Sequence, residues 1–415
     1  MSLPSTHVDF IKKHRPLLVE AAKAKGLALL NAAGEPYAES FVGYDETFSD
    51  EVFETEFEIF LQSMAKESGF DIDEIRAQRP LIERVHALRI AVTKQTIQYE
   101  YPLLINYNIS GEKTFYFGDN LAEHLAHTEV NLKSALIELP FPSCMFVYTS
   151  PAVVNAMHNI NGDEGRLKMN TAGVDYTAPV SVFISLINEV RSISDKDFIA
   201  NGRKLLITAF HSRLPDNSYL CVKRELFLGD DWDIERSLRT DWEKILPDGD
   251  CGVTTIRPDG NITESSDEVF YKDGLSFIRI IINSILYLIS DNADVISQRS
   301  PRKDLIDSAM QQKSLPKRKK LLQKAKRFSE LDYSHVGQSI GAIHFKQKDS
   351  SNEQAEPTTQ NLNDNGLKLR RFMVRGHWRN QVFGEKRHDR KLIWIKPFYK
   401  GADIADVINK PYIVK

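Results

Sequence analysis

The sequence predicts an α+β fold, and three observations support that prediction. Residues 8–30 alternate apolar and basic positions with helical spacing, and between Val52 and Val92 apolar side chains recur at three- and four-residue intervals, as on one helix face. Residues 101–300 contain several runs rich in β-branched and aromatic residues, which favour strands. Helical spacing returns at 234–245 and 270–289, so helices surround a mixed or antiparallel sheet instead of alternating with parallel strands. A chain of 415 residues is also long enough for two or three compact units.

The first region, residues 1–100, is predicted to be helical. Ser49 is suited to cap a helix that begins with Asp50 and Glu51, because acids suit the positive end of a helix. The buried stripe of that helix is expected to consist of Val52, Phe53, Phe57, Phe60, Leu61 and Met64. Pro80 fits the first turn of a following helix. The stripe of this second helix is expected to contain Leu81, Val85, Leu88 and Val92.

The body, residues 101–300, is predicted to hold the sheet. Strands at 103–107 and 113–117 are expected to form a hairpin around a loop that contains Gly111. A helix over 121–138 is expected to follow. Further strands are expected at 144–149, 180–186, 205–210 and 219–228. The short connection between the last two strands favours antiparallel pairing.

Neither export nor membrane insertion is predicted. The longest apolar run, 275–289, includes Arg279 and Asn283 and is shorter than the about 20 apolar residues that a membrane-spanning helix needs. The N-terminus has no apolar signal core. Single cysteines occur at Cys144, Cys221 and Cys251, and no two of them have zinc-ligand spacing. We therefore expect a cytoplasmic protein with reduced thiols, no cofactor and no membrane partner.

Charge is divided unevenly along the chain. Residues 313–400 contain 21 Lys and Arg against 8 Asp and Glu, a balance of +13. Because the whole chain carries −3, the remaining residues carry −16. Such a division suits one end of the chain to an anionic partner, most often a nucleic acid.

Residues 301–345 are predicted to form a basic helix followed by a strand at about 340–345. Within them, 313–327 has eight basic residues and no acid. This segment is either a phosphate-binding surface, with Lys317, Arg318, Lys319 and Lys320 in contact, or merely an exposed basic helix or linker. The next segment, 346–366, has Leu362 as its single large apolar residue, and we expect a disordered linker there.

The last region, residues 367–415, is predicted to be a basic β-hairpin module. Its two flanks, Leu367–Gln381 and Lys391–Gly401, alternate with a period of two around a loop of about ten residues. Trp378 and Trp394 are either cross-strand core partners or base-stacking surfaces. Gly376 allows another backbone or a phosphate to approach closely. The residues expected to contact nucleic acid are Arg371, Arg375, His377, Arg379, Arg387, Arg390 and Lys396.

No complete active site is evident. The group Glu123, His124 and His127 is either a partial metal site or a set of surface side chains. The acids Asp230, Asp231, Asp233 and Glu235 are either a magnesium site or the acidic start of a helix. His377 between Arg375 and Arg379 is a candidate general acid–base in RNA cleavage. Without an evident second catalytic group, binding is favoured over catalysis, and enzymatic activity is left open.

The hairpin motifs resemble a known family. Arg375-Gly376-His377-Trp378 and Trp394-Ile395-Lys396-Pro397 are similar to the C-terminal signature of a family carried by phages and plasmids. Its known member is an anti-CRISPR protein that acts on production of the type V-A Cas nuclease. Weaker similarities are found at 139–149, around Ile280 and at 336–341.

The resemblance implies a mobile-element anti-defence protein. Such a protein would recognise a nascent peptide on the ribosome and promote decay of the mRNA that encodes it. Its partners would be RNA or a ribosome–nascent chain complex, together with a target peptide that the sequence does not identify. Two alternatives are a nucleic-acid-binding regulator without peptide recognition and a toxin-like ribonuclease that uses His377.

Overall fold

The computed structural model describes twelve segments of the chain. They are residues 3–33, 50–85, 87–159, 178–193, 199–212, 219–245, 253–254, 268–298, 301–312, 314–325, 332–343 and 372–400. Four features expected from the sequence lie outside these residues: the Ser49 cap, Cys251, the 346–366 linker and Arg371.

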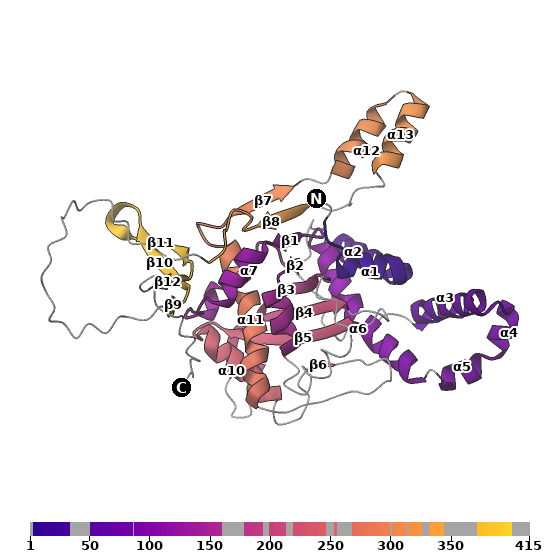
Figure 1. Ribbon diagram of the computed structural model, residues 1–415, viewed down its shortest axis with the longest axis horizontal. Helices are drawn as coiled ribbons and strands as arrows, with labels where there is room; N and C mark the ends of the chain where they lie inside the picture. Colours follow the sequence, from indigo (N-terminus) through magenta and orange to yellow (C-terminus); the bar gives the residue numbers. More distant parts are fainter. Residues whose placement is uncertain are drawn as a thin grey trace, which may run out of the picture.

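An eight-stranded mixed sheet forms the centre of the molecule, in the order β6-β5-β4-β3-β2-β1-β8-β7 (Figure 1). β1 pairs in parallel with β2 and β8, and the other neighbours are antiparallel. This arrangement confirms the α+β prediction. The strands are β1 Thr114–Phe117, β2 Ser143–Tyr148, β3 Val180–Ile193, β4 Ile199–Ser212, β5 Tyr219–Gly229, β6 Val253–Thr254, β7 Val295–Gln298 and β8 Tyr333–Val336.

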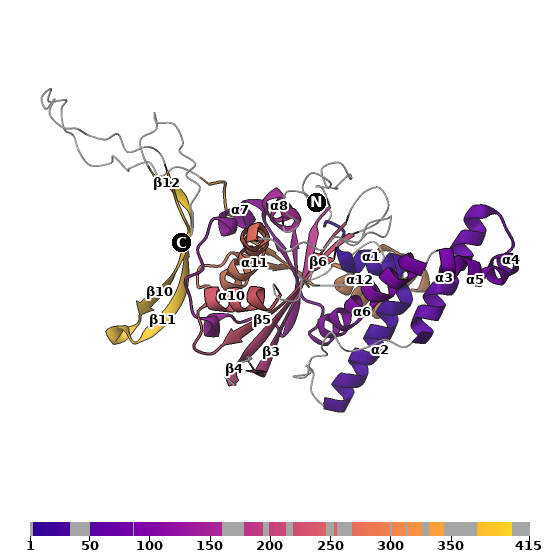
Figure 2. The same ribbon diagram turned by 90° about the horizontal axis from the view of Figure 1, so that it is seen from below.

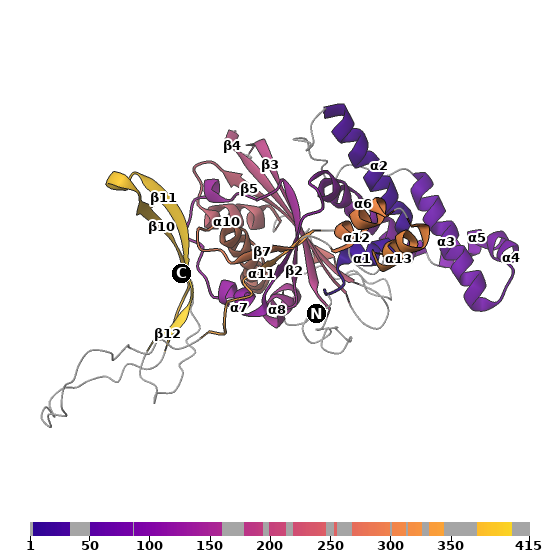
Figure 3. The same cartoon turned by 90° about the horizontal axis from the view of Figure 1, so that it is seen from above.

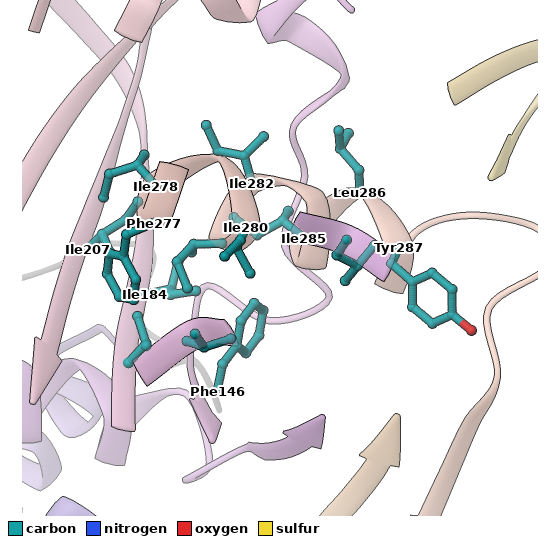
Figure 4. Packing of buried hydrophobic residues seen from close by; sticks show 14 of the residues in the cluster. Phe146, Ile184, Ile207, Phe277, Ile278, Ile280, Ile282, Ile285, Leu286 and Tyr287 are labelled. Atoms are coloured by element: carbon teal, nitrogen blue, oxygen red, sulfur yellow. The ribbon is translucent and has the colours of Figure 1, made fainter. Parts of the chain in front are cut away.

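One face of the sheet is covered by four helices (Figure 2). They are α7 Asp119–Ala126, α8 Pro151–Asn159, α10 Ile234–Ile245 and α11 Glu268–Leu288. The apolar helix α11 is the centre of this layer, where Phe277 and Ile280 pack with Phe146, Ile184 and Ile207 of the strands (Figure 4). Burial of such side chains contributes about 25 cal/mol per Å² of apolar surface, which fixes the position of α11 on the sheet.

The opposite face is covered by N-terminal helices, α1 His7–His14, α2 Pro16–Ala33 and α6 Ala87–Ile109 (Figure 2). A buried carboxylate, Glu100, accepts hydrogen bonds in this layer from His7 Nε2 at 2.8 Å and from Arg15. Burial raises the pKa of Glu100, but Arg15 and His7 outweigh burial and hold it below its usual value. Glu100 therefore stays ionised inside the protein.

Two groups of helices project from this body (Figure 1). One group consists of α3 Asp50–Ser68, α4 Ile72–Ala77 and α5 Arg79–Val85. The other is the pair α12 Pro301–Gln311 and α13 Leu315–Ala325, which is inserted between β7 and β8. No helix in the described segments is long and apolar enough to cross a membrane.

The C-terminal strands form a long hairpin over the helix layer, on the side away from the sheet (Figures 2 and 3). They are β9 Phe372–Val374, β10 His377–Phe383, β11 Asp389–Ile395 and β12 Phe398–Lys400. β10 pairs with β11 and β9 pairs with β12, both antiparallel. The loop between β10 and β11 has five residues, 384–388, instead of the expected ten, because the alternation continues through the polar residues up to Phe383.

Most predicted elements of the body are confirmed, and the antiparallel β4–β5 pair is among them. Residues 103–107, however, continue helix α6 and do not form a strand. This part of α6 is buried on nearly every side, so it lacks the one-sided apolar pattern that identifies a surface helix. The hairpin expected around Gly111 is therefore a helix-to-strand connection.

Three further expectations were wrong in detail. The helix expected over 121–138 ends at Ala126, because 127–129 hydrogen-bond to the C-terminal hairpin instead. The strand expected at 340–345 lies earlier, at β8, and the described residues 340–343 have no regular structure. Leu81 and Val85 are 57% and 68% exposed, so α5 buries Ile82 in place of these two members of the expected stripe, while the side chains of Leu88 and Val92 lie outside the described residues.

Candidate functional site

The two hairpin tryptophans anchor β10 and β11 to the body. Trp378 lies directly opposite Trp394, and residues opposite each other in antiparallel strands share a face. Their ring centroids are 6.5 Å apart, and the residues are only 8% and 5% exposed. Both belong to the same core as α7 and α11. The interpretation of these tryptophans as cross-strand core partners is therefore confirmed.

Each indole N–H has an acceptor on the body. Trp378 Nε1 donates to Asn283 Oδ1 at 2.8 Å, and Trp394 Nε1 donates to Thr128 Oγ1 at 3.2 Å. Asn283 Nδ2 in turn donates to the backbone oxygens of Leu125 and Thr128, each at 2.9 Å. Because a buried polar group without a partner costs about 1–3 kcal/mol, this network fixes the position of the hairpin.

Gly376 lets the backbone of the body approach the hairpin. Its N–H donates to the oxygen of His127 at 3.0 Å, and its own oxygen accepts from the N–H of Glu129 at 2.8 Å. A Cβ atom at position 376 would lie 2.5 Å from Thr128 Oγ1 and 2.8 Å from Pro397 Cδ. The predicted close approach is confirmed, and the approaching group is the backbone of 127–129.

A second set of hydrogen bonds joins β11 to the end of α11. The Asn292 side chain donates to the oxygen of Trp394 at 2.9 Å and accepts from its N–H at 3.0 Å. The N–H of Asp291 donates to the oxygen of Leu392 at 2.9 Å. Sequence reasoning missed Asn283 and Asn292 as anchors. An asparagine inside an apolar helix is a signal that could have identified Asn283, because a buried amide requires partners.

The charged residues of the two motifs remain at the surface. Arg375, His377, Arg379 and Lys396 are exposed, as are Arg387 and Arg390 near the tip. We call the side of β10–β11 away from the tryptophans the outer face; its cross-strand pairs are His377–Ile395, Arg379–Ile393, Gln381–Lys391 and Phe383–Asp389. This face combines cations with apolar and aromatic side chains, because Phe383 is 43% exposed and has Lys391 Nζ 5.3 Å from its ring. Such a mixture is suited to phosphate and base contact.

Electrostatics near the anchor keep two histidines neutral. Burial lowers the pKa of His124, whose Nε2 lies 3.0 Å from the oxygen of Gly341, and Lys396 lowers the pKa further. Burial also lowers the pKa of His127, and Arg375 adds to that effect. The expectation that His124 is a surface residue was wrong, since it is 1% exposed. No three His, Cys, Asp or Glu side chains within the described segments are grouped so as to hold a metal ion.

The acids before α10 support that helix. Asp233 Oδ1 accepts from the backbone N–H of Arg236 at 2.7 Å, as a helix-capping residue does. Glu235 accepts from Arg279 through both carboxylate oxygens at 2.8 Å. The Asp233 contact favours the interpretation of the cluster as the acidic start of a helix, whereas Glu235 joins α10 to α11.

The cations predicted on 313–327 form a separate surface. Lys317, Lys319 and Lys320 are exposed on α13, and Arg318 is half-buried with its guanidinium 3.2 Å from Met310 Sδ. Figures 1 and 3 show α13 toward the opposite end of the molecule from the C-terminal hairpin. The predicted nucleic-acid contacts therefore divide into two surfaces instead of one.

The chain matches a known protein family. The sequence model of the AcrVA2-like family, described as the anti-CRISPR type V subtype A2 family, matches residues 115–399. The match covers more than half of the chain and extends from β1 to β12. No curated protein and no solved structure matches the chain.

Proposed function

Because the chain belongs to the AcrVA2-like family of anti-CRISPR proteins, we propose that it acts against a CRISPR defence by recognising a nascent peptide and promoting decay of the mRNA. The C-terminal hairpin contacts RNA in this proposal. A helical layer formed by residues before 115, where the family match begins, covers one face of the sheet. The peptide recognised by this chain therefore need not be the one recognised by other members.

One observation carries the RNA-binding part of the proposal. The glycine and tryptophans of the hairpin motifs are used for attachment to the body, so the cations between them are left on the solvent side. Arg375 contacts Glu129 at 3.4 Å, but both side chains are nearly half exposed. Because exposed ion pairs contribute about 0–1 kcal/mol, a phosphate can replace this carboxylate at little cost.

The charge distribution supports RNA binding by the cationic segment and not by the acidic remainder of the chain. The cationic segment 313–400 suits RNA, whereas the remainder of the chain carries −16 and would repel it. RNA is therefore directed to the two cationic surfaces. Each contact with a single-stranded phosphate lowers the logarithmic salt slope of binding by about 0.7, so binding should weaken steeply with salt.

The decisive experiment is a pull-down of the tagged protein from a translating lysate, followed by RNA sequencing. We expect one transcript to be enriched, and the enrichment to disappear when the encoded N-terminal peptide is recoded. Enrichment that is independent of translation would instead indicate a nucleic-acid-binding regulator. Cleavage of RNA by the purified protein, abolished by His377→Ala, would indicate a ribonuclease.

Variants of the exposed arginines around Gly376 test the contact residues. Arg375→Ala combined with Arg379→Ala should lower RNA affinity and reduce its salt dependence. Lys66→Ala combined with Arg84→Ala removes the same charge from exposed positions on α3 and α5 and should leave both unchanged. Unchanged RNA binding in the first pair, or salt-insensitive binding by the unmodified protein, would contradict the assignment.

A further inference from the structure

β7 lies at one edge of the central sheet. It is the terminal strand of the sheet, and in the described part of the chain its single neighbour is β8. All four of its residues are exposed, with Val295 at 37% and Ile296 at 49%. Proteins normally protect such edges with charged side chains, prolines or very short strands. β7 has the sequence Val-Ile-Ser-Gln, which contains neither a charged side chain nor a proline. The opposite edge strand, β6, is only two residues long.

The two faces beside this edge differ in chemistry. Ile296 pairs with His335, which lies between Tyr333 and Tyr116 on the same face of the sheet. The ring centroids of these three side chains are 5.3–6.1 Å apart, and each is half-buried. On the other face, the hydroxyls of Ser297 and Ser334 are 3.0 Å apart. Val295, which pairs with Val336, lies on this second face, and Gln298 lies on the first. The first face is therefore mainly aromatic, and the second combines small aliphatic side chains with hydroxyl groups.

The helix pair α12–α13 limits what can approach β7. It leaves the sheet just after Gln298, at Pro301, and Figure 1 shows it extending past the free edge of the strand. If a second copy of the protein paired through its own β7, its eight-stranded sheet would collide with the α12–α13 pair. A single extended chain would not. The projection also carries the cations Lys317, Lys319 and Lys320.

We infer that β7 accepts an extended peptide as an added strand of the sheet. Backbone hydrogen bonds along an edge give affinity, and alternate side chains give selectivity. The peptide has apolar or aromatic residues facing Ile296 and its aromatic neighbours, alternating with small residues facing Val295 and Ser297. Where it continues past Gln298 toward the cations of α13, it carries acids. The inference rests on the proposed function in that the bound segment is the nascent peptide.

The test uses short overlapping synthetic peptides from the N-terminal region of the type V-A Cas nuclease, with affinity measured by fluorescence anisotropy. In the tightest binder, alternate backbone nitrogens are then methylated. We expect one set of methyl groups to abolish binding and the other set to be tolerated, because only alternate N–H groups of an added strand face β7.

Side-chain variants give an independent readout. Ile296→Lys should weaken peptide binding about tenfold or more, because a charge on the edge opposes strand addition. Leu81→Lys makes the same change at an exposed position of α5 and should leave binding unchanged. Circular dichroism on both variants confirms that the protein remains folded.

Several results would overturn the inference. They are failure of every peptide to bind, equal effects of the two methylation sets, and unchanged binding in Ile296→Lys. A concentration-dependent dimer that Ile296→Lys dissociates would assign the edge to a second copy. If transcript enrichment persists in Ile296→Lys, the edge inference fails while the proposed function stands. If the methylation pattern appears without any transcript enrichment, the edge inference stands and the proposed function fails.

Discussion

The C-terminal hairpin and the α12–α13 pair are both cationic, but they are attached to the body differently. The hairpin inserts Trp378 and Trp394 into the core and satisfies each indole N–H there. The helices α12 and α13 pack against each other and leave Met310 and Leu315 61% and 76% exposed. The cations of the hairpin are therefore positioned by buried contacts, and those of α13 only by helix geometry.

This difference shows that charge alone does not identify how a surface is built. Similar clusters of Lys and Arg occur on a rigidly docked strand pair and on a projecting helix pair at the other end of the molecule. A docked surface can present guanidinium groups in a fixed arrangement to phosphates, which adds geometric selectivity to charge attraction.

The largest expected effect is on stability. Trp394→Ala should lower the free energy of unfolding by about 3–5 kcal/mol, because it leaves a cavity in the core. Leu315→Ala in α13 should change it by less than about 0.5 kcal/mol, because the side chain is exposed. Urea denaturation followed by circular dichroism measures both. Equal losses would show that α12–α13 is as strongly integrated as the hairpin.

A smaller effect is expected from the close approach at Gly376. Gly376→Ala places a Cβ 2.5 Å from Thr128 Oγ1, so the hairpin must move from its anchor. Overpacking of this kind costs about 1–3 kcal/mol, measured in the same denaturation experiment. Gln311→Ala, at an exposed position of α12, serves as the control. A neutral Gly376→Ala variant would mean that the docking contact adjusts freely.

Acid should loosen the hairpin before it affects α12–α13. Burial lowers the pKa of His124 from 6.5, so the folded protein holds the imidazole neutral while the unfolded chain takes up a proton. The contribution of neutral His124 to stability is therefore present above pH 6.5. It is lost as the pH falls through the lower pKa that His124 has in the folded protein. Hydrogen exchange in β10 and β11, corrected for intrinsic rates, should report this loss, and His124→Gln should reduce it. Residues 301–325 contain no histidine and provide an internal reference.

The smallest expected effect on stability comes from α13. Lys319→Ala combined with Lys320→Ala should change the unfolding free energy by less than about 0.5 kcal/mol. If both lysines contact single-stranded phosphates, the logarithmic salt slope of RNA binding should become less negative by about 1.4. Because the two surfaces are far apart, this change should add to that of the Arg375 and Arg379 variants. An unchanged slope would restrict RNA contact to the hairpin.

The sequence alone determined the elements whose signals are local. Runs of β-branched residues located β2 to β5, and period-two alternation located β10 and β11 with Trp378 and Trp394 as core partners. The motifs of the hairpin also identified the family, which the match over residues 115–399 confirms. These features depend on residue types and short spacings, which are visible without knowing what packs against them.

Only the tertiary structure decided the rest. Residues 103–107 form a helix, but their sequence shows neither a helical nor a strand period, because they are buried on nearly all sides. The cations of α13 and those of the hairpin form two separate surfaces, because the fold places α13 and the hairpin toward opposite ends of the molecule. The role of Asn283 depends on Trp378, 95 residues away in the chain. Such contacts follow from the packing of distant segments, which no local pattern records.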